Sequence, residues 1–301
     1  MYIDYRSAQK PLPWKGILVE IGFGRGDFTL KLAEENRNKK VLGFELSAIS
    51  VEKLIKRAKE KGLDNVYCSR IDAYWGFYLL LRDSSVEEIH INYPDPWFKK
   101  RHHKRRLTKR ENLYIYAKKL VLGGKIFLRT DHFPMVEFTL QESESLRSFE
   151  GNLKERNVRE PITKYERKWL SAGKRLYELT LTKVREPEDV KIRGIEEVKE
   201  VFPTQVEGKR PRPEALRGRK VCLKEGVFLR VFEVYERLGD YVLEVLLSEK
   251  GFVQKFFISI RKKGERGYVV DVSPFSEVLR TEGIRAAIEF IASEGFTPSS
   301  R

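Results

Sequence analysis

One carboxylate lies between two prolines at the start of a strongly cationic segment. The stretch Asn92-Tyr93-Pro94-Asp95-Pro96-Trp97 continues as Phe98-Lys99-Lys100-Arg101-His102-His103-Lys104-Arg105-Arg106. Each proline fixes its own φ and biases the preceding residue toward extended backbone, so the carboxylate of Asp95 should be held in place. A held acid beside a block of positive charge predicts an active site that adjoins an anion-binding surface. The plain alternative is a solvated basic turn that closes an ordinary loop.

A glycine-rich loop earlier in the chain is suited to bind a ligand. Residues 20–26 read Glu-Ile-Gly-Phe-Gly-Arg-Gly and complete a run of apolar residues. The glycines at positions 22, 24 and 26 let the backbone approach a ligand closely, with the N–H groups of a following helix facing it. The dinucleotide-binding fingerprint G-x-G-x-x-G requires a glycine at position 27, where this chain has Asp27. Taken alone, the loop is also compatible with a plain tight turn.

Two acids at the ends of the next predicted strands favour a nucleoside pocket. Glu45 ends the second strand, where a carboxylate can accept hydrogen bonds from both ribose hydroxyls. Asp72 follows the third strand, where an acid can accept from an adenine amino group. Each acid alone could be a surface residue or a helix cap. Acids after successive strands, around one glycine loop, together predict a nucleoside site.

The elements that must position these residues alternate between strand and helix. Short β-branched runs predict strands, and the amphipathic stretches between them predict helices. The alternation predicts an α/β fold with a mostly parallel, doubly wound sheet, in which ligands bind outside the carboxyl ends of the strands. The predicted strands are 17–21, 40–45, 65–68, 86–92 and 125–130, and the predicted helices are 27–36, 47–61, 74–81, 108–120 and 134–146.

The pattern changes beyond Arg185, so residues 1–185 are expected to form the catalytic domain. Residues 186–220 contain several prolines and little periodicity, which predicts a linker with one short helix at 195–201. Residues 221–301 predict a small α+β domain, an antiparallel sheet with one covering helix. Its expected strands are 227–237, 241–247, 252–261 and 267–272, and its expected helix is 276–294.

The positive charge is concentrated in the first part of the chain. The formal net charge is +15 over 301 residues, yet residues 186–301 hold 21 Lys and Arg against 20 Asp and Glu. Nearly the whole excess therefore lies in residues 1–185. A partner rich in phosphate would be drawn to that part, with binding that weakens as salt is added.

Composition also bears on the compartment and the metal content. Cys68 and Cys222 lie in apolar runs without C-x-x-C spacing or neighbouring histidines, which favours buried free thiols over a zinc site. The sequence has no signal peptide and no apolar run of membrane length, so a cytoplasmic protein is expected. The charged share of 34%, rich in Lys and Glu, is typical of a thermophile.

The order of these motifs resembles bacterial tRNA (guanine-N7)-methyltransferases. The resemblance covers residues 15–184 and rests on the glycine loop, Gly43-Phe44-Glu45, Asp72-Ala73, Pro94-Asp95-Pro96-Trp97 with its basic tail, Thr130-Asp131 and Thr163-Lys164-Tyr165-Glu166. It implies a class I fold of the Rossmann-like kind that uses S-adenosyl-L-methionine. It also implies methyl transfer to N7 of a guanine in the variable loop of tRNA. The segment beyond residue 185 is an addition that this family core does not need.

The resemblance assigns expected roles residue by residue, with Asp95 as the catalytic residue and no metal. The cofactor would be bound by Glu20, Gly22, Gly24, Gly26, Glu45, Asp72 and Asp95. The target guanine and its nucleotide would be held by Lys99, Asp131, Thr163, Lys164, Tyr165 and Glu166. The tRNA phosphates would be contacted by Lys100, Arg101, Lys104, Arg105 and Arg106. Three aromatic residues are candidates to stack on the base: Trp97, Tyr165 and Trp169.

Other functions remain open on the sequence alone. A methyltransferase of the same fold could act on another RNA, although the turn after the fourth strand is not the Asn/Asp-Pro-Pro-aromatic turn of exocyclic-amine methyltransferases. A nicotinamide oxidoreductase is disfavoured by Asp27, and a non-catalytic RNA-binding protein with a nucleotide pocket is a further alternative. The C-terminal segment has two equal interpretations, a second tRNA contact or a stabilising or oligomerising module. The oligomeric state stays open.

Overall fold

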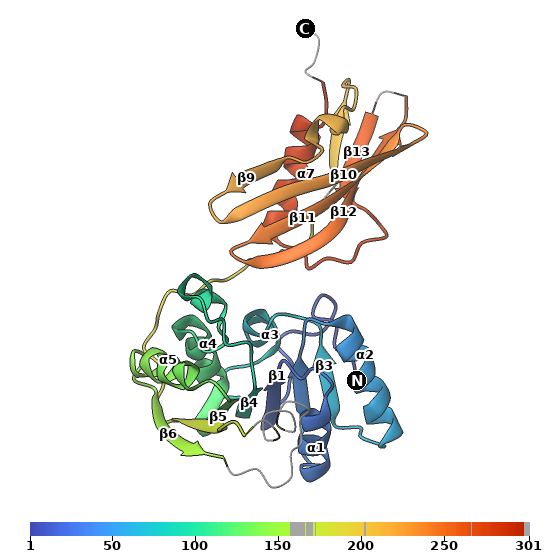
Figure 1. Cartoon of the computed structure of the whole chain (residues 1–301). Coiled ribbons are helices and arrows are strands. Elements are labelled where there is room, and N and C mark those ends of the chain that lie inside the picture. The colour runs from blue at the N-terminus through green and yellow to red at the C-terminus, as the bar shows by residue number, and fades with distance from the viewer. Residues whose placement is uncertain (157–165, 167–170, 172, 202, 266, 298–301) are drawn as a thin grey trace. The chain divides into compact units, whose positions relative to one another are not determined.

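The chain forms two compact units, Met1–Lys191 and Ile192–Arg301, each with its own sheet (Figure 1). The computed structural model describes residues 1–156, 166, 171, 173–201, 203–265 and 267–297. Within these residues no helix has the length and apolar character needed to cross a membrane.

The first unit is built on a seven-stranded sheet with the order β3-β2-β1-β4-β5-β7-β6. Strands β1 to β5 run parallel, and β7 is antiparallel to both β5 and β6. The predicted doubly wound α/β fold is confirmed. The strands are β1 Ile17–Ile21, β2 Val41–Phe44, β3 Val66–Ser69, β4 Val86–Asn92, β5 Leu120–Thr130, β6 Phe149–Glu155 and β7 Tyr177–Lys183. The helices are α1 Asp27–Glu35, α2 Ala48–Glu60, α3 Ala73–Leu80, the short η1 Lys100–Arg105, α4 Arg110–Lys119 and α5 Phe133–Glu144.

Helices cover both faces of this sheet. Val41 of β2 packs in one core cluster with apolar residues of α1 and α2. Phe44, of opposite parity on the same strand, contacts Phe77 of α3 with ring centroids 5.5 Å apart, and Phe77 contacts Tyr116 of α4 at 4.6 Å. Since successive residues of a strand point to opposite faces, α1 and α2 lie on one face and α3 and α4 on the other. Burial from both sides explains why β1 and β2 are buried at every position.

Strands β6 and β7 were not expected from the sequence. The side chains of β6 are exposed or half-exposed along its whole length, so the strand lacks the apolar alternation that predicts one. It forms because it pairs with β7, which pairs in turn with β5. Strand β5 itself begins at Leu120, directly after α4 and before the predicted start at residue 125.

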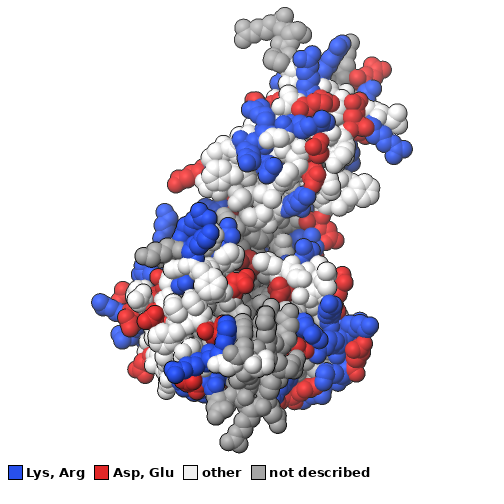
Figure 2. Space-filling view, in the orientation of Figure 1, with Lys and Arg blue, Asp and Glu red and all other residues white. Residues whose placement is uncertain are grey.

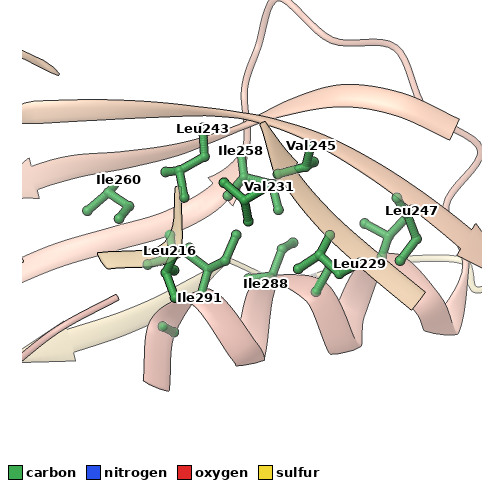
Figure 3. Close-up of a cluster of buried hydrophobic side chains, with 14 of the residues drawn as sticks. Leu216, Leu229, Val231, Leu243, Val245, Leu247, Ile258, Ile260, Ile288 and Ile291 are labelled. Atoms are coloured by element: carbon green, nitrogen blue, oxygen red, sulfur yellow. The ribbon is translucent and has the colours of Figure 1, made fainter. Parts of the chain in front are cut away.

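The second unit is a six-stranded antiparallel sheet with the order β8-β13-β12-β11-β10-β9 and one long helix, α7 Glu282–Glu294. Its core lies between the sheet and α7, where Leu229, Val231, Ile258 and Ile260 pack against Ile288 and Ile291 of the helix (Figure 3). The strands are β8 Thr204–Glu207, β9 Lys220–Lys224, β10 Val227–Arg237, β11 Asp240–Glu249, β12 Phe252–Lys263 and β13 Gly267–Val272, with a short helix η2 at Pro213–Leu216.

Two expectations for this part of the chain differ from the structure. Residues 195–201 form no helix, so that prediction is wrong. Residues 186–220, expected as a linker, contribute β8, η2 and the first residue of β9 to the second unit. The segment is ordered by long-range contacts, since Leu216 is fully buried in the core and β8 pairs with β13. The expected helix at 276–294 begins later, at Glu282.

Candidate active site

A cavity of about 390 Å³ lies at the carboxyl ends of the parallel strands, here called the strand-end cavity. Its lining includes residues from the ends of β1, β2, β3 and β4, as expected for a ligand site of this fold. Five of the residues expected to bind a cofactor meet there: Gly22, Gly24, Glu45, Asp72 and Asp95. These five residues, up to 73 positions apart in sequence, thus converge on one cavity whose size suits a small-molecule ligand.

The glycine loop has a backbone that other residues rarely adopt. Gly22, Gly24 and Gly26 have φ values of +71°, +51° and +76°. A Cβ atom on Gly22 or Gly24 would meet no described atom within 4 Å, which leaves their outer side open toward a ligand. A Cβ on Gly26 would lie 2.5 Å from Cδ1 of Leu54 in α2. Gly26 therefore permits both the turn into α1 and the close packing of α1 on α2.

The two acids of the predicted nucleoside pocket are held by backbone N–H groups. The carboxylate of Glu45 accepts from the N–H groups of Gly24 at 3.0 Å, Leu46 at 2.7 Å and Ser47 at 3.0 Å. Asp72 caps α3 by accepting from the N–H of Tyr74 at 3.0 Å. Asp72 both caps α3 and lines the strand-end cavity, so its role as a helix cap does not exclude a role in binding a nucleoside. A carboxylate has about four acceptor positions, so both acids retain capacity toward a ligand.

Glu20 is buried beside a second hollow that shares Gly22, Gly24, Asn92 and Tyr93 with the strand-end cavity. The side chain is 2% exposed, and its carboxylate accepts from the Thr29 hydroxyl and from Nδ2 of Asn92 at 2.9 Å. Burial raises its pKa to about 7, against the lowering effect of these two hydrogen bonds. Glu20 therefore exchanges a proton in the neutral range.

The loop that carries Asp95 is fixed by more than its two prolines. Tyr93 and Trp97 have φ values of +52° and +47°, in the left-handed region. Nε of Arg106 donates to the carbonyl of Pro96 at 2.9 Å, and the guanidinium carbon of Arg106 lies 4.5 Å from the ring centroid of Phe138. The carboxylate of Asp95 lines the cavity and is exposed to solvent.

The cationic segment does not present all its side chains to solvent. Lys99, Arg101 and Arg105 are exposed, and Arg105 also covers the ring of Trp97 at 4.9 Å. Arg106 was expected to contact phosphate, but it is 3% exposed and supports the Asp95 loop from inside. The side chains of Lys100 and Lys104 lie outside the described part of the structure. Figure 2 shows Lys and Arg side chains gathered on the part of the first unit that carries η1.

The expected guanine-binding residues are only partly described. Glu166 is 2% exposed, and its Oε1 accepts from the hydroxyl of Tyr93 at 2.9 Å and from Nη1 of Arg156. Burial raises the pKa of Tyr93, with the charge of Glu166 adding to the effect, so this hydroxyl stays protonated and donates. Asp131 is paired with Lys174 at 2.6 Å. Thr163, Lys164, Tyr165 and the candidate aromatic Trp169 lie outside the described residues.

A chain of buried and half-buried polar side chains, most of them charged, connects Glu20 to Glu166 and was missed by sequence reasoning. Asn92 receives a hydrogen bond from Nη1 of Arg129 at 2.9 Å, and Nε of Arg129 donates to Glu178 at 2.6 Å. Glu178 also lies 3.5 Å from Nε of Arg156, the residue that pairs with Glu166. We call this series from Glu20 to Glu166 the charge chain. Arg129 directly precedes the Thr130-Asp131 motif, which was a usable signal, but Arg156 and Glu178 lie on or next to strands that were not predicted.

The parallel sheet order, the glycine loop and the strand-end acids define a class I methyltransferase, the Rossmann-like class that uses S-adenosylmethionine. A family model described as "Putative methyltransferase" matches residues 15–179. Over 97% of its length the chain is 54% identical to the tRNA (guanine-N(7)-)-methyltransferase of Aquifex aeolicus (strain VF5), covering 98% of that protein. It is 32% identical to the corresponding enzyme of Thermotoga maritima, covering 94% of this chain and 93% of that protein. The chain belongs to the tRNA (guanine-N(7)-)-methyltransferase family.

Among solved structures, the 16S rRNA methyltransferase KamB is similar at 18% identity with a TM-score of 0.45, over 60% of this chain and 91% of that chain.

Proposed function

We propose that this protein transfers the methyl group of S-adenosylmethionine to N7 of a guanine in the variable loop of tRNA. One observation carries the proposal: the strand-end cavity brings Glu45, Asp72 and Asp95 together next to the cationic segment, in a chain closely similar to an enzyme named for this reaction. A tRNA substrate would place the protein in the cytoplasm.

The residues around the cavity fit the cofactor. Glu45 retains about one acceptor position, which suits a ribose hydroxyl, and Asp72 suits the adenine amino group. Apolar walls from Ile21, Phe44 and Leu46 suit the purine ring. Glu20 faces the adjoining hollow, where its ionised form would attract the amino group of the methionine moiety. When bound, the cofactor supplies an electrophilic methyl group on a sulfonium.

The chemistry requires positioning rather than proton removal. N7 of guanine has a lone pair and no proton, so the transfer needs no strong general base and, as proposed, no metal ion. The purine becomes cationic as the methyl group arrives. The carboxylate of Asp95, held by the strained loop and by Arg106, would stabilise that developing charge and orient both reactants.

Guanine would be selected by acceptors for its N1–H and exocyclic amino group. Glu166 and Asp131 are suited to this task, with Lys99, Thr163, Lys164 and Tyr165 holding the nucleotide. Arg156 and Tyr93 would fix the orientation of Glu166 and favour its ionised, accepting form. The tRNA backbone would lie along the cationic segment, where Lys100, Arg101, Lys104 and Arg105 contact its phosphates.

The test is methyl incorporation from labelled S-adenosylmethionine into unmodified tRNA transcripts, with 7-methylguanosine located by borohydride and aniline cleavage. A single cleavage in the variable loop is expected, and it should disappear when that guanine is replaced by adenine. Asp95→Asn should abolish turnover while tRNA binding persists. Methylation without cleavage at a guanine would overturn the target atom, and cofactor binding without any methylation would favour a non-catalytic RNA-binding protein.

A further inference from the structure

The sheet of the second unit has one face that no helix of the described residues covers, here called the open sheet face. The other face packs on α7 through alternating residues such as Leu229 and Ile258 (Figure 3). Residues of the opposite parity point away from that core. Among them, Phe228 is 53% exposed, Val253 51% and Phe257 38%. Large apolar side chains gathered on one exposed face mark an interaction site.

Three cations lie in one cross-strand row of this face. Lys220 of β9 is paired with Arg230 of β10, Arg230 with Leu246 of β11, and Leu246 with Lys255 of β12. Residues paired directly across antiparallel strands share a face, and neighbouring strands are about 4.8 Å apart. The row therefore places a positive charge on three of four adjacent strands, with Leu246 on the fourth.

Aromatic side chains lie on both sides of this row. Phe228 precedes Arg230 by two positions on β10, and Phe257 follows Lys255 by two positions on β12, so all four share the open sheet face. Between them, the guanidinium of Arg230 lies 4.4 Å and Nζ of Lys255 5.3 Å from the ring centroid of Phe232. A hollow of about 330 Å³ is lined by Lys220, Cys222, Phe228 and Arg230 among others.

Two of the three cations have no acidic partner in the described part of the chain. Lys255 pairs with Glu244, whereas neither Lys220 nor Arg230 has a described carboxylate within salt-bridge distance. An apolar protein surface laid over this face would bury both charges unpaired, which is strongly unfavourable. An RNA backbone would instead neutralise them, while its bases stack on the rings. The charge pattern together with the exposed rings therefore favours RNA over an apolar protein surface.

We propose that the open sheet face binds unpaired bases of RNA. The bases would stack on Phe228 and Phe257, and Lys220 and Arg230 would contact the adjoining phosphates. A sheet whose exposed aromatic side chains stack about two or three bases is an established way for proteins to bind single-stranded RNA. Because any base offers a flat ring, the face would recognise unpaired bases rather than a sequence. That the RNA is the substrate tRNA rests on the function proposed above.

Cys222 provides a local probe of this face. Its thiol is exposed, contrary to the buried thiol expected from the sequence, and lies opposite Phe228 in the register, whereas Cys68 is buried as expected. The rate of alkylation of Cys222 by a maleimide can therefore be followed in the full chain, with and without an unmodified tRNA transcript. We expect the transcript, and also an oligouridine, to slow alkylation several-fold. A blunt RNA duplex with the same number of phosphates should protect much less.

Matched variants separate this face from the rest of the molecule. Phe228→Ala/Arg230→Gln removes one ring and one cation from the face. Phe275→Ala/Lys262→Gln removes the same groups elsewhere, since Phe275 is 95% exposed in a loop and Lys262 has the parity of the α7 side. The first variant should weaken tRNA binding at least about fivefold and abolish protection of Cys222. The second should match the wild-type chain, and circular dichroism checks that both are folded.

The outcomes distinguish this inference from the proposed function. No protection of Cys222 by tRNA or oligouridine would overturn the inference even if tRNA is methylated. Protection by oligouridine without methylation of tRNA would support the inference and count against the proposed reaction. Protection that grows with protein concentration in the absence of RNA, together with a doubled mass in light scattering, would overturn it in favour of contact between two copies.

Discussion

Neighbouring arginines in the cationic segment have different surroundings. Arg106 is buried, donates to the Pro96 carbonyl and stacks on Phe138, whereas Arg101 is exposed. A buried guanidinium bound to loop backbone fixes that loop, and an exposed one is available to phosphate. The position of Asp95 therefore depends on a residue whose sequence context looks the same as that of the neighbours proposed to contact phosphate.

Arg106→Gln should lower stability and turnover without changing the salt dependence of tRNA binding. The Pro96 carbonyl loses its donor and the Phe138 contact is lost, so we expect about 1–3 kcal/mol of destabilisation in urea unfolding. Arg101→Gln is the matched control and should do the reverse, with unchanged unfolding, weaker binding and a shallower salt slope. If Arg106→Gln behaves like Arg101→Gln in all three measurements, Arg106 is a phosphate ligand after all.

Glu20 should make cofactor binding depend on pH in the neutral range. Burial raises its pKa to about 7, and a cation bound beside it favours the ionised form. Affinity for S-adenosylmethionine should therefore rise from about pH 6 to about pH 8 and then level off, as measured by titration calorimetry. The free energy of unfolding should depend on pH in the opposite direction to cofactor affinity. The stabilisation that Glu20 gives to the folded chain is fully present below its ordinary pKa of 4.5 and is lost as pH rises through about 7. Glu20→Gln should remove both dependences, and a pH profile that persists in this variant would assign them elsewhere.

At the scale of elements, the antiparallel strands β6 and β7 complete the charge chain. They bring Glu178 against Arg129 of β5 and Arg156 against Glu166. Both carboxylates are nearly buried and depend on these guanidinium groups, since an unpaired charge in the interior is strongly unfavourable. Strands β6 and β7 therefore support the proposed guanine-binding residue Glu166 through charge as well as through backbone pairing.

Arg156→Met should destabilise the chain by about 3–5 kcal/mol, because Glu166 loses its guanidinium partner while staying buried. Adding Glu166→Gln should cost less than the sum of the two single changes, and the difference in a double-mutant cycle measures the coupling. Methyl transfer should fall in both single variants while cofactor affinity is retained. Additive effects on unfolding would show that the two side chains are not energetically coupled.

The predictable part of the fold is the part whose sequence pattern is local. Strands β1 and β2 are buried at every position and β3 and β4 at most of theirs, and the acids that follow these strands could be assigned because ligands bind at the carboxyl ends of parallel strands. Strand β6 has no apolar alternation, and β8 has four residues, so neither gives a signal without its partner strand. The charge chain joins residues that approach only after the sheet has formed, and the burial of Arg106 likewise depends on α5.

At the scale of the whole molecule, the abundance of charge predicts resistance to heat. Charged residues make up 34% of the sequence, and many form ion pairs, including the buried pairs of the charge chain. We expect a thermal unfolding midpoint above about 65 °C, the upper end of the range common for mesophilic domains. Calorimetry at low and high salt checks the cause, since screening should lower the midpoint if surface pairs contribute. A midpoint near 50 °C would contradict the expectation.

Because the two units differ in net charge, ionic strength should affect how selectively the protein binds RNA. Phosphate contacts at the strongly basic first unit would weaken steeply as salt is added, whereas base stacking on the rings of the weakly basic second unit would be screened much less. At low ionic strength the enzyme would bind almost any RNA through the phosphates of the RNA backbone. At higher ionic strength, only an RNA that also offers unpaired bases to the second unit would stay bound, so added salt would weaken binding overall while increasing the selectivity among RNAs.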